Sequence, residues 1–263
     1  MNLLEAIILG LIQGLTEFLP VSSSGHLELG KYLFGIDHES NFYFSIAVHG
    51  ATVLSTVFVL WKELLGLFRG VMKFTMNEET KYALKLLISM IPVGIVGLFM
   101  RDTVKEYFTG NMTMLGSFFL ITALLLFMTR VIKPKERDLT YIDSFIIGIA
   151  QAFAVLPAIS RSGATIATGM MLGNRKSEIA RFSFLMVLVP VIGANILEIG
   201  SGDLLNEGTS FAVISAGFIT AFISGYIACR WMINLVRRGN LAWFGLYCVA
   251  AGIFSFILGM NGL

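Results

Sequence analysis

Apolar residues along this 263-residue chain fall into long blocks that are separated by short charged stretches. Six blocks approach the length of about 20 residues that a helix needs to cross a bilayer. They cover residues 42–61, 86–100, 113–130, 182–200, 211–229 and 241–259. A soluble domain would distribute its apolar positions at a helix or strand period instead. The pattern therefore predicts an all-α, polytopic membrane protein with six spanning helices.

Two regions, residues 3–34 and 141–173, depart from this pattern. Each holds two short apolar runs that are separated by a proline and small polar residues. Neither run is long enough to cross a bilayer alone. Broken apolar segments of this kind are typical of re-entrant helix pairs, so we expect two such pairs beside the six spanning helices.

Basic residues are concentrated in four of the connecting stretches. Most of the 19 Lys and Arg residues lie in residues 62–85, 130–140, 174–181 and 230–239. The positive-inside rule places these stretches in the cytoplasm. This topology is consistent only if each broken region enters and leaves the membrane on the same side. It then puts both termini outside, with the first broken region opening outside and the second inside.

The two halves of the chain also resemble each other in sequence. One constant shift, without gaps, pairs Gly10 with Gly148, Gln13 with Gln151, Ser22 with Ser160, Ser24 with Ser162 and Gly25 with Gly163. We therefore expect a single membrane domain, residues 1–263, built as an inverted repeat of two units at about 1–135 and 136–263. Inverted repeats with broken helices place their site near the midplane, where the repeats meet.

The first broken region carries a polar motif at residues 13–26, Gln-Gly-Leu-Thr-Glu-Phe-Leu-Pro-Val-Ser-Ser-Ser-Gly-His. Gln13 and Glu17 are four residues apart and share a helix face. Pro20 disfavours helix at the residue before it, and the serines that follow suit the N-cap of a second helix. Ionisable residues at membrane depth are costly and normally functional. Glu17 and His26 are therefore candidate site residues.

The second broken region repeats this form at residues 157–165, Pro-Ala-Ile-Ser-Arg-Ser-Gly-Ala-Thr. Its charge is Arg161, whose planar guanidinium suits a phosphate or a carboxylate. Two helix N-termini that aim at one point make an anion site, so the motif pair favours an anionic ligand. The alternative is that Arg161 only neutralises Glu17 as a structural ion pair.

Composition and the remaining polar residues change this picture little. Only 14% of the residues are charged, against about 25% in soluble domains. Cys229 and Cys248 lie in or beside apolar blocks without a CxxC motif, which indicates packing rather than metal binding. We expect no cleavable signal peptide, a solvated His38 in an outer loop, and a packing or gating role for His49.

The two motifs, at residues 17–26 and 160–165, together resemble the undecaprenyl-diphosphate phosphatase family of the bacitracin-resistance type. The likeness covers nearly the whole chain in length, layout and spacing. It implies a multi-pass enzyme of the bacterial inner membrane whose site faces outside. Such an enzyme hydrolyses undecaprenyl diphosphate to the monophosphate carrier and phosphate for cell-wall synthesis. The chain departs from the family at Ala158, where a glycine is usual.

The resemblance also implies roles for single residues. It implies four catalytic residues, Glu17, Ser23, His26 and Arg161. Glu17 is in addition the expected ligand of a divalent cation, Mg²⁺ or Ca²⁺. The expected substrate-binding residues are Gln13, Ser22, Ser24, Gly25, Ser160, Ser162, Gly163 and Thr165. The expected partners are a polyprenyl diphosphate and membrane lipid, without nucleic acid. A homodimer is compatible with the size of the chain, although no motif demands one.

The mechanistic hypothesis is phosphoryl transfer, in which Arg161 and the helix N-termini hold the terminal phosphate. Ser23 attacks the phosphorus with His26 as base and later as acid. Glu17 either orients His26 or holds the cation. Direct attack by water stays open.

Two other classes of protein are alternatives to this enzyme: lipid transporters and a second class of lipid phosphatases. A transporter or flippase for a phosphate-bearing lipid is the alternative, because inverted repeats with broken helices are also a transporter architecture. The other large class of lipid phosphatases needs a histidine downstream of its arginine. The last histidine here is His49, so that class is excluded.

Overall fold

The computed structural model describes residues 1–36, 42–100, 103–104, 107, 110–131, 136–200, 210–238 and 240–260. His38 lies outside these residues. The described helices are α1 (Leu3–Phe18), α2 (Ser23–Phe34), α3 (Phe42–Val59), α4 (Trp61–Val71), α5 (Glu78–Phe99), α7 (Met112–Val131), α8 (Tyr141–Phe153), α9 (Arg161–Met171), α10 (Lys176–Met186), α11 (Leu188–Gly200), α12 (Phe211–Arg238) and α13 (Ala242–Met260). An isolated bridge joins Arg137 to Asn174, and the described part contains no named strand. The predicted all-α class is confirmed.

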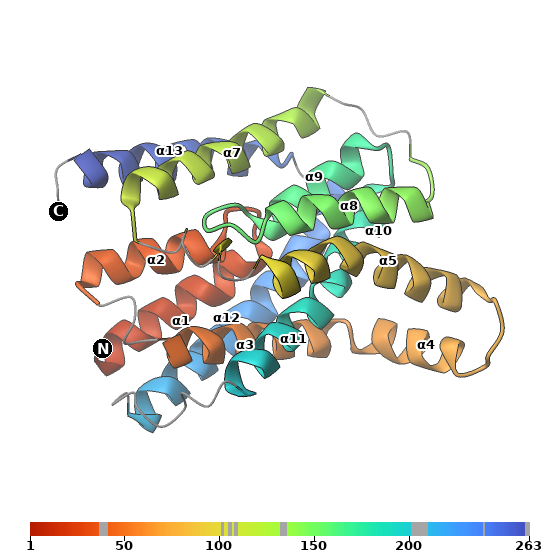
Figure 1. The fold of residues 1–263 in the computed structure, drawn as a ribbon, viewed down its shortest axis with the longest axis horizontal. Coiled ribbons are helices and arrows are strands. Elements are labelled where there is room, and N and C mark those ends of the chain that lie inside the picture. Colours follow the sequence, from red (N-terminus) through yellow and green to blue (C-terminus); the bar gives the residue numbers. More distant parts are fainter. Residues whose placement is uncertain are drawn as a thin grey trace.

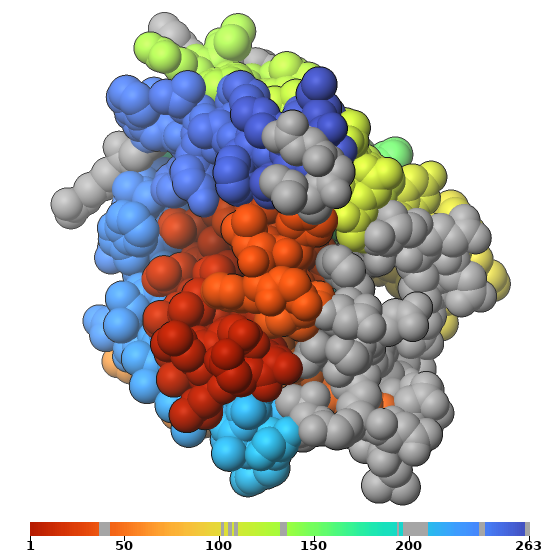
Figure 2. Space-filling view, turned by 90° about the vertical axis from the view of Figure 1, so that its left-hand side faces the viewer, coloured from red at the N-terminus to blue at the C-terminus, as the bar shows by residue number. Residues whose placement is uncertain are grey.

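Most helices run roughly along the long axis of the molecule (Figure 1). The start of α1 and the end of α13 lie at one end of this axis, and the connection from α4 to α5 lies at the other (Figure 1). Seen from the first end, α1 and α2 are exposed between α12 and α13 (Figure 2). The first pair of short helices therefore reaches the surface at the end where the chain begins.

Four described helices are long and apolar enough to cross a membrane, namely α5, α7, α12 and α13. They overlap the predicted blocks 86–100, 113–130, 211–229 and 241–259. Their outward faces are rich in large apolar side chains, including Leu98, Leu124 and Ile227. Such faces suit contact with lipid chains rather than water. The chain thus has the apolar helices of a multi-pass membrane protein.

The other two predicted spans are not single straight helices. The predicted span 182–200 is divided at Val187 between α10 and α11. Pro190 accounts for this break, because its ring clashes with the carbonyl of the residue four positions earlier. The predicted span 42–61 ends at Val59, and the chain then bends by 73° into α4. Residues 62–71 were expected to be part of a basic loop, and no helix breaker marks the bend at Leu60.

Both broken regions are pairs of short helices, as the sequence predicts. α1 ends at Phe18, two residues before Pro20, and α2 begins after the N-cap Ser22. α8 ends at Phe153, and α9 begins after the N-cap Ser160. Each N-cap side chain accepts a hydrogen bond from a glycine amide three residues later, which satisfies one of the free N–H groups of a helix start.

The first helix of each broken region packs on a long helix from the other half of the chain. α1 lies along α12, and α8 lies along α5. A Cβ added at Gly14 would lie 2.0 Å from the Ser224 hydroxyl, and one at Gly148 would lie 2.4 Å from the Ser89 carbonyl oxygen. Contacts this close leave no space for any side chain. The half-helices are therefore seated directly on the backbone of their neighbours.

Candidate functional site

The two helix breaks meet tip to tip inside the molecule. The Ser162 hydroxyl donates to the Leu19 carbonyl oxygen at 3.2 Å. An added Cβ at Gly25 would lie 2.9 Å from the Cα of Ala158. Thr122 of α7 supports the second break, because its hydroxyl donates to the carbonyl of Ala158 and accepts from the amide of Ser160, both at 3.0 Å. The break peptides, which have no helical partners, are thus bonded inside the protein.

The carboxylate of Glu17 is the centre of a polar cluster at this meeting point. Its Oε2 accepts hydrogen bonds from the Gln13 amide at 2.9 Å and from the Ser23 hydroxyl at 2.5 Å. Its Oε1 lies 4.0 Å from Nη2 of Arg161, and Nε2 of His49 lies 3.9 Å from Oε2. The side chain of Glu17 is only 13% exposed. A buried carboxylate therefore joins both motifs. Gln13 and Glu17 share a helix face, as predicted, and Arg161 lies beside Glu17.

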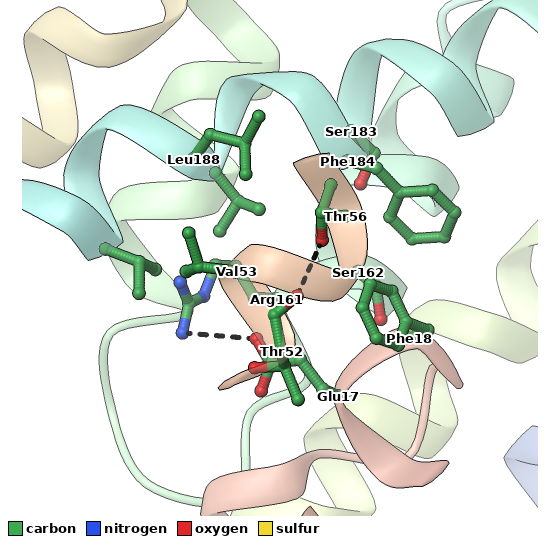
Figure 3. A pocket seen from close by; sticks show the side chains of 12 residues that line it. Glu17, Phe18, Thr52, Val53, Thr56, Arg161, Ser162, Ser183, Phe184 and Leu188 are labelled. Carbon is green, nitrogen blue, oxygen red and sulfur yellow. Dashed lines mark hydrogen bonds and ion pairs between the residues drawn. The ribbon is translucent and has the colours of Figure 1, made fainter. Parts of the chain in front are cut away.

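A cavity opens beside this cluster. It is small, with a volume of about 20 Å³, roughly the room that one water molecule needs. Glu17 and Arg161 form its charged wall, and Figure 3 shows the guanidinium directed toward the carboxylate. The rest of the lining consists of hydroxyl and apolar side chains: Phe18, Thr52, Val53, Thr56, Ser162, Ser183, Phe184, Val187, Leu188 and Val191. Such a lining offers charge at one side and apolar surface elsewhere.

The start of α9 provides the cationic side of the cavity. Arg161 is the first residue of α9, so its side chain stands beside the positive end of the helix. Thr165 donates to the Arg161 carbonyl oxygen at 2.8 Å and lies 2.6 Å from the hydroxyl of Ser183 on α10. The start of α9 is thereby tied to the neighbouring helix. An anion in the cavity would meet a charge that is held in place.

The other predicted substrate-binding residues build the helix starts. The Ser22 and Ser24 hydroxyls lie 3.2 Å apart, and those of Ser160 and Ser162 lie 3.3 Å apart. The glycine amides of residues 25 and 163 are used by the N-caps. Ser162 is the member of this set that also lines the cavity. The remaining members shape the two helix N-termini.

His26 is held away from Ser23. Its Nδ1 lies 2.7 Å from the Ser22 carbonyl oxygen, and its Nε2 lies 2.7 Å from the Tyr247 hydroxyl. Its ring stacks on Tyr247 and meets the edge of Phe119. Among the described residues, no hydrogen bond joins His26 to Ser23. In this arrangement the Ser23 hydroxyl is bonded to Glu17, although the sequence hypothesis paired it with His26.

The sequence analysis did not assign two residues, His49 and Tyr247, to this site. His49 was expected to pack or to gate, and the structure places its Nε2 beside Glu17. Tyr247 was not considered. The only sequence signal for His49 was an ionisable residue at the start of an apolar block. Tyr247 lies on α13, far from both motifs in sequence, and no local pattern singles it out.

The donor set at the cavity is compatible with a divalent cation only if the ligand helps to hold it. The described residues contain no group of three or more His, Cys, Asp or Glu side chains that could hold a metal ion. Glu17 and His49 bring two such side chains together. Mg²⁺ usually keeps water and takes one or two carboxylates together with substrate phosphates. The residues therefore fit a cation that is shared with a phosphate.

Comparison with known proteins points in one direction. The profile of the family described as "Bacitracin resistance protein BacA" matches residues 6–254. The chain is 51% identical over 259 residues to an undecaprenyl-diphosphatase of Parabacteroides distasonis, with 97% of each chain covered. It is 49% identical over 262 residues to one of Bacteroides fragilis, with 98% covered. It is 37% identical over 265 residues to undecaprenyl-diphosphatase 1 of Bacillus cereus, with 97% covered.

Proposed function

The chain belongs to the bacitracin resistance protein BacA family, and from this premise we propose that it is an undecaprenyl-diphosphatase of the bacterial inner membrane. The reaction hydrolyses undecaprenyl diphosphate to undecaprenyl phosphate and inorganic phosphate, which recycles the lipid carrier of cell-wall synthesis. The observation that carries the proposal is the Ser23 hydroxyl at 2.5 Å from the Glu17 carboxylate. Glu17 in turn lies beside Arg161 at the wall of a cavity whose remaining lining is hydroxyl and apolar.

Arg161 and the starts of α2 and α9 bind the terminal phosphate. A guanidinium matches phosphate oxygens with a fork of donors. The amides at a helix start add partial positive charge. Held charges of this kind stabilise the charge that develops on a phosphoryl group during transfer. The ion pair with Glu17 fits this role, because its 4.0 Å separation is too long for a direct hydrogen bond and leaves the guanidinium donors free for substrate.

Ser23 is the nucleophile of the proposed reaction. Its oxygen attacks the terminal phosphorus, its proton passes to Glu17, and the bond between this phosphorus and the bridging oxygen breaks, which releases undecaprenyl phosphate. Water then cleaves the phosphoserine and restores the hydroxyl. The hydrogen bond from Ser23 to Glu17 supports Glu17 as the proton acceptor. The earlier hypothesis gave this proton to His26. Direct attack by water on the bound diphosphate is the competing route.

Glu17 is also the proposed ligand of a divalent cation, Mg²⁺ or Ca²⁺, with His49 beside it. Such a cation would draw charge from phosphate oxygens. Gln13 donates to the carboxylate here, so an amide occupies the position that a second carboxylate would take in a site with more acidic ligands. Fewer carboxylates imply weaker cation binding before the substrate arrives.

An inverted repeat of about 1–135 and 136–263 is part of the proposal. Each unit has a pair of short helices, a divided helix and two long helices. α1 on α12 and α8 on α5 are matching contacts between the units. The start of α1 and the end of α13 lie opposite the α4–α5 connection, which belongs to a basic stretch (Figure 1). This arrangement supports outside termini and a site that opens outside. A homodimer stays a prediction.

Release of phosphate by the purified protein tests the function. In detergent with a divalent cation, undecaprenyl diphosphate should yield inorganic phosphate and undecaprenyl phosphate. The Ser23→Ala protein should lose nearly all turnover, whereas Ser117→Ala on the outer face of α7 should keep it. Near-normal turnover by Ser23→Ala would favour direct attack by water.

Transport is the alternative to hydrolysis, because a scaffold of this type also serves transporters. A fluorescent polyprenyl diphosphate in liposomes reports movement between leaflets. Lipid movement without phosphate release from the wild-type protein would favour transport. Phosphate release in detergent, where no leaflets exist, would favour hydrolysis.

A further inference from the structure

His26 lies at a junction of three helices, outside the Glu17 cluster. It is on the first turn of α2, between Phe119 of α7 and Tyr247 of α13. The His26 and Tyr247 rings are 5.5 Å apart and tilted by only 10°, and the Tyr247 hydroxyl lies 2.7 Å from Nε2. Stacking and a hydrogen bond between the same two residues fix both the plane and the rotation of the imidazole.

The partners of the two ring nitrogens determine the tautomer. Nδ1 lies 2.7 Å from the carbonyl oxygen of Ser22, and a carbonyl oxygen can only accept. Nδ1 therefore carries the proton, and the lone pair of the neutral ring is on Nε2. The Tyr247 hydroxyl can donate to this lone pair. The phenol thus completes the set of partners that holds the neutral ring with Nε2 as its basic nitrogen.

We propose that Tyr247 is a positioning residue for His26, acting through the stacked ring and the hydroxyl bond to Nε2. This inference rests on the proposed diphosphatase function. The imidazole that Tyr247 holds donates from Nδ1 to the carbonyl oxygen of Ser22, directly before Ser23, and so helps to keep the Ser23 hydroxyl on the Glu17 carboxylate. Tyr247 makes no bond to Ser23, Glu17 or Arg161, so its effect on the reaction passes through His26.

The position of Tyr247 makes it suitable for substitution. Its side chain belongs to the outer face of α13, and the residue is 49% exposed. Tyr247→Phe keeps the ring that stacks on His26 and removes only the hydroxyl. Tyr226→Phe on α12 is the matched control, because its hydroxyl bonds to Arg230 on the same helix.

The first measurement needs no turnover. The chain has three histidines, so ¹⁵N-histidine labelling gives three imidazoles, which histidine-to-glutamine variants assign. Tyr247→Phe should shift the Nε2 resonance of His26 and leave that of His49 in place, and Tyr226→Phe should shift neither. An unchanged His26 resonance in Tyr247→Phe would overturn the proposal, even if the protein proved to have no diphosphatase activity.

The second measurement concerns the reaction. Tyr247→Phe should lower kcat by about tenfold, the loss expected for one orienting hydrogen bond, with KM nearly unchanged because the phosphate is held by other residues. Tyr247→Leu, which also loses the stacked ring, should lower kcat further. If the wild-type enzyme turns over and Tyr247→Phe keeps its kcat, the positioning role is refuted while the diphosphatase function stands.

Discussion

The two helix breaks share one construction and carry different charges. Each begins its second helix with a serine N-cap, a second serine in hydroxyl contact and a glycine whose amide the cap accepts. The first break is short, from Leu19 to Ser22, and the second runs from Ala154 to Ser160. The first contributes a carboxylate and the hydroxyl that we propose as nucleophile, and the second contributes Arg161. The same N-cap arrangement is therefore compatible with different charged side chains.

The breaks also differ in where the backbone turns. Ser22, the N-cap of α2, has a φ of 70°, whereas the N-cap of α9 is extended and Ala158, two residues before it, has a φ of 58°. A left-handed residue other than glycine costs about 1–2 kcal/mol. Each break therefore holds one strained residue, and the tip-to-tip contacts keep it in place. Substitution of matched residues in the two breaks can test this comparison.

The largest effect should come from Arg161→Ala. Loss of a cation that stabilises a transferring phosphoryl group costs about 10³-fold or more in rate, and Arg161→Lys should recover only part of it. Phosphate release from undecaprenyl diphosphate measures both. Arg175→Ala is the control, because Arg175 pairs with Asp138 outside the cavity. Activity within a few fold of wild type in Arg161→Ala would reduce Arg161 to a structural partner of Glu17.

The paired glutamines should respond in opposite ways. Gln13 donates to Glu17, so Gln13→Leu should lower turnover by about tenfold through loss of that bond. Gln151 is buried, and neither of its amide atoms has a hydrogen-bond partner in the described structure. An unpaired buried polar group costs about 1–3 kcal/mol. Gln151→Leu should therefore raise the melting temperature and spare turnover.

Turnover and thermal unfolding of both glutamine variants decide this comparison. Equal losses of turnover would show that the two positions serve the reaction alike. A lower melting temperature in Gln151→Leu would indicate that the amide is satisfied by bound water.

The two N-cap serines, Ser22 and Ser160, should contribute equally to the stability of the folded protein. Loss of a serine cap costs about 1 kcal/mol, which lowers the melting temperature of a chain of this size by about 2–4 °C. Ser22→Ala and Ser160→Ala should each show this shift, measured by thermal unfolding against Ser117→Ala, whose hydroxyl bonds only within the exposed face of α7. A large difference between the two caps would contradict the shared construction.

The smallest effect should be that of Ala158→Gly. Glycine removes the left-handed strain of about 1–2 kcal/mol, but it also removes a fully buried methyl group worth about 0.8 kcal/mol. The melting temperature should change by only a few degrees. Ala164→Gly, in the buried interior of α9, has no strain to relieve and should clearly destabilise. A large loss of stability in Ala158→Gly would mean that the methyl contact dominates.

Features that depend on neighbours in sequence could be predicted. The prolines, the serine caps and the shared face of Gln13 and Glu17 all act within a few residues, and the structure places them as expected. The meeting of Arg161 with Glu17 followed from the repeated motif and the cost of burying a charge. Local rules were therefore enough for the frame of the site.

Features that depend on contacts between distant segments could not be predicted. Block length does not reveal a bend, so the α3–α4 bend at Leu60 was missed. The pairing of Ser23 with Glu17 instead of His26 depends on Tyr247, which draws the imidazole toward α13. The mechanistic hypothesis paired Ser23 with His26, but the sequence cannot show which neighbour each side chain contacts.

The tip-to-tip contact of the breaks also bears on how the protein is made. The carbonyl oxygens of Leu19 and Pro20 accept from Ser162 and Cys248, which leave the ribosome long after them. The Leu19 carbonyl oxygen can meanwhile accept from the Val21 amide. The Pro20 carbonyl oxygen lacks its Cys248 partner until then, and an unsatisfied peptide group inside a membrane costs several kcal/mol. The first break therefore reaches its final set of hydrogen bonds only after the second half has been inserted. Assembly of the proposed catalytic centre therefore follows synthesis of the second half.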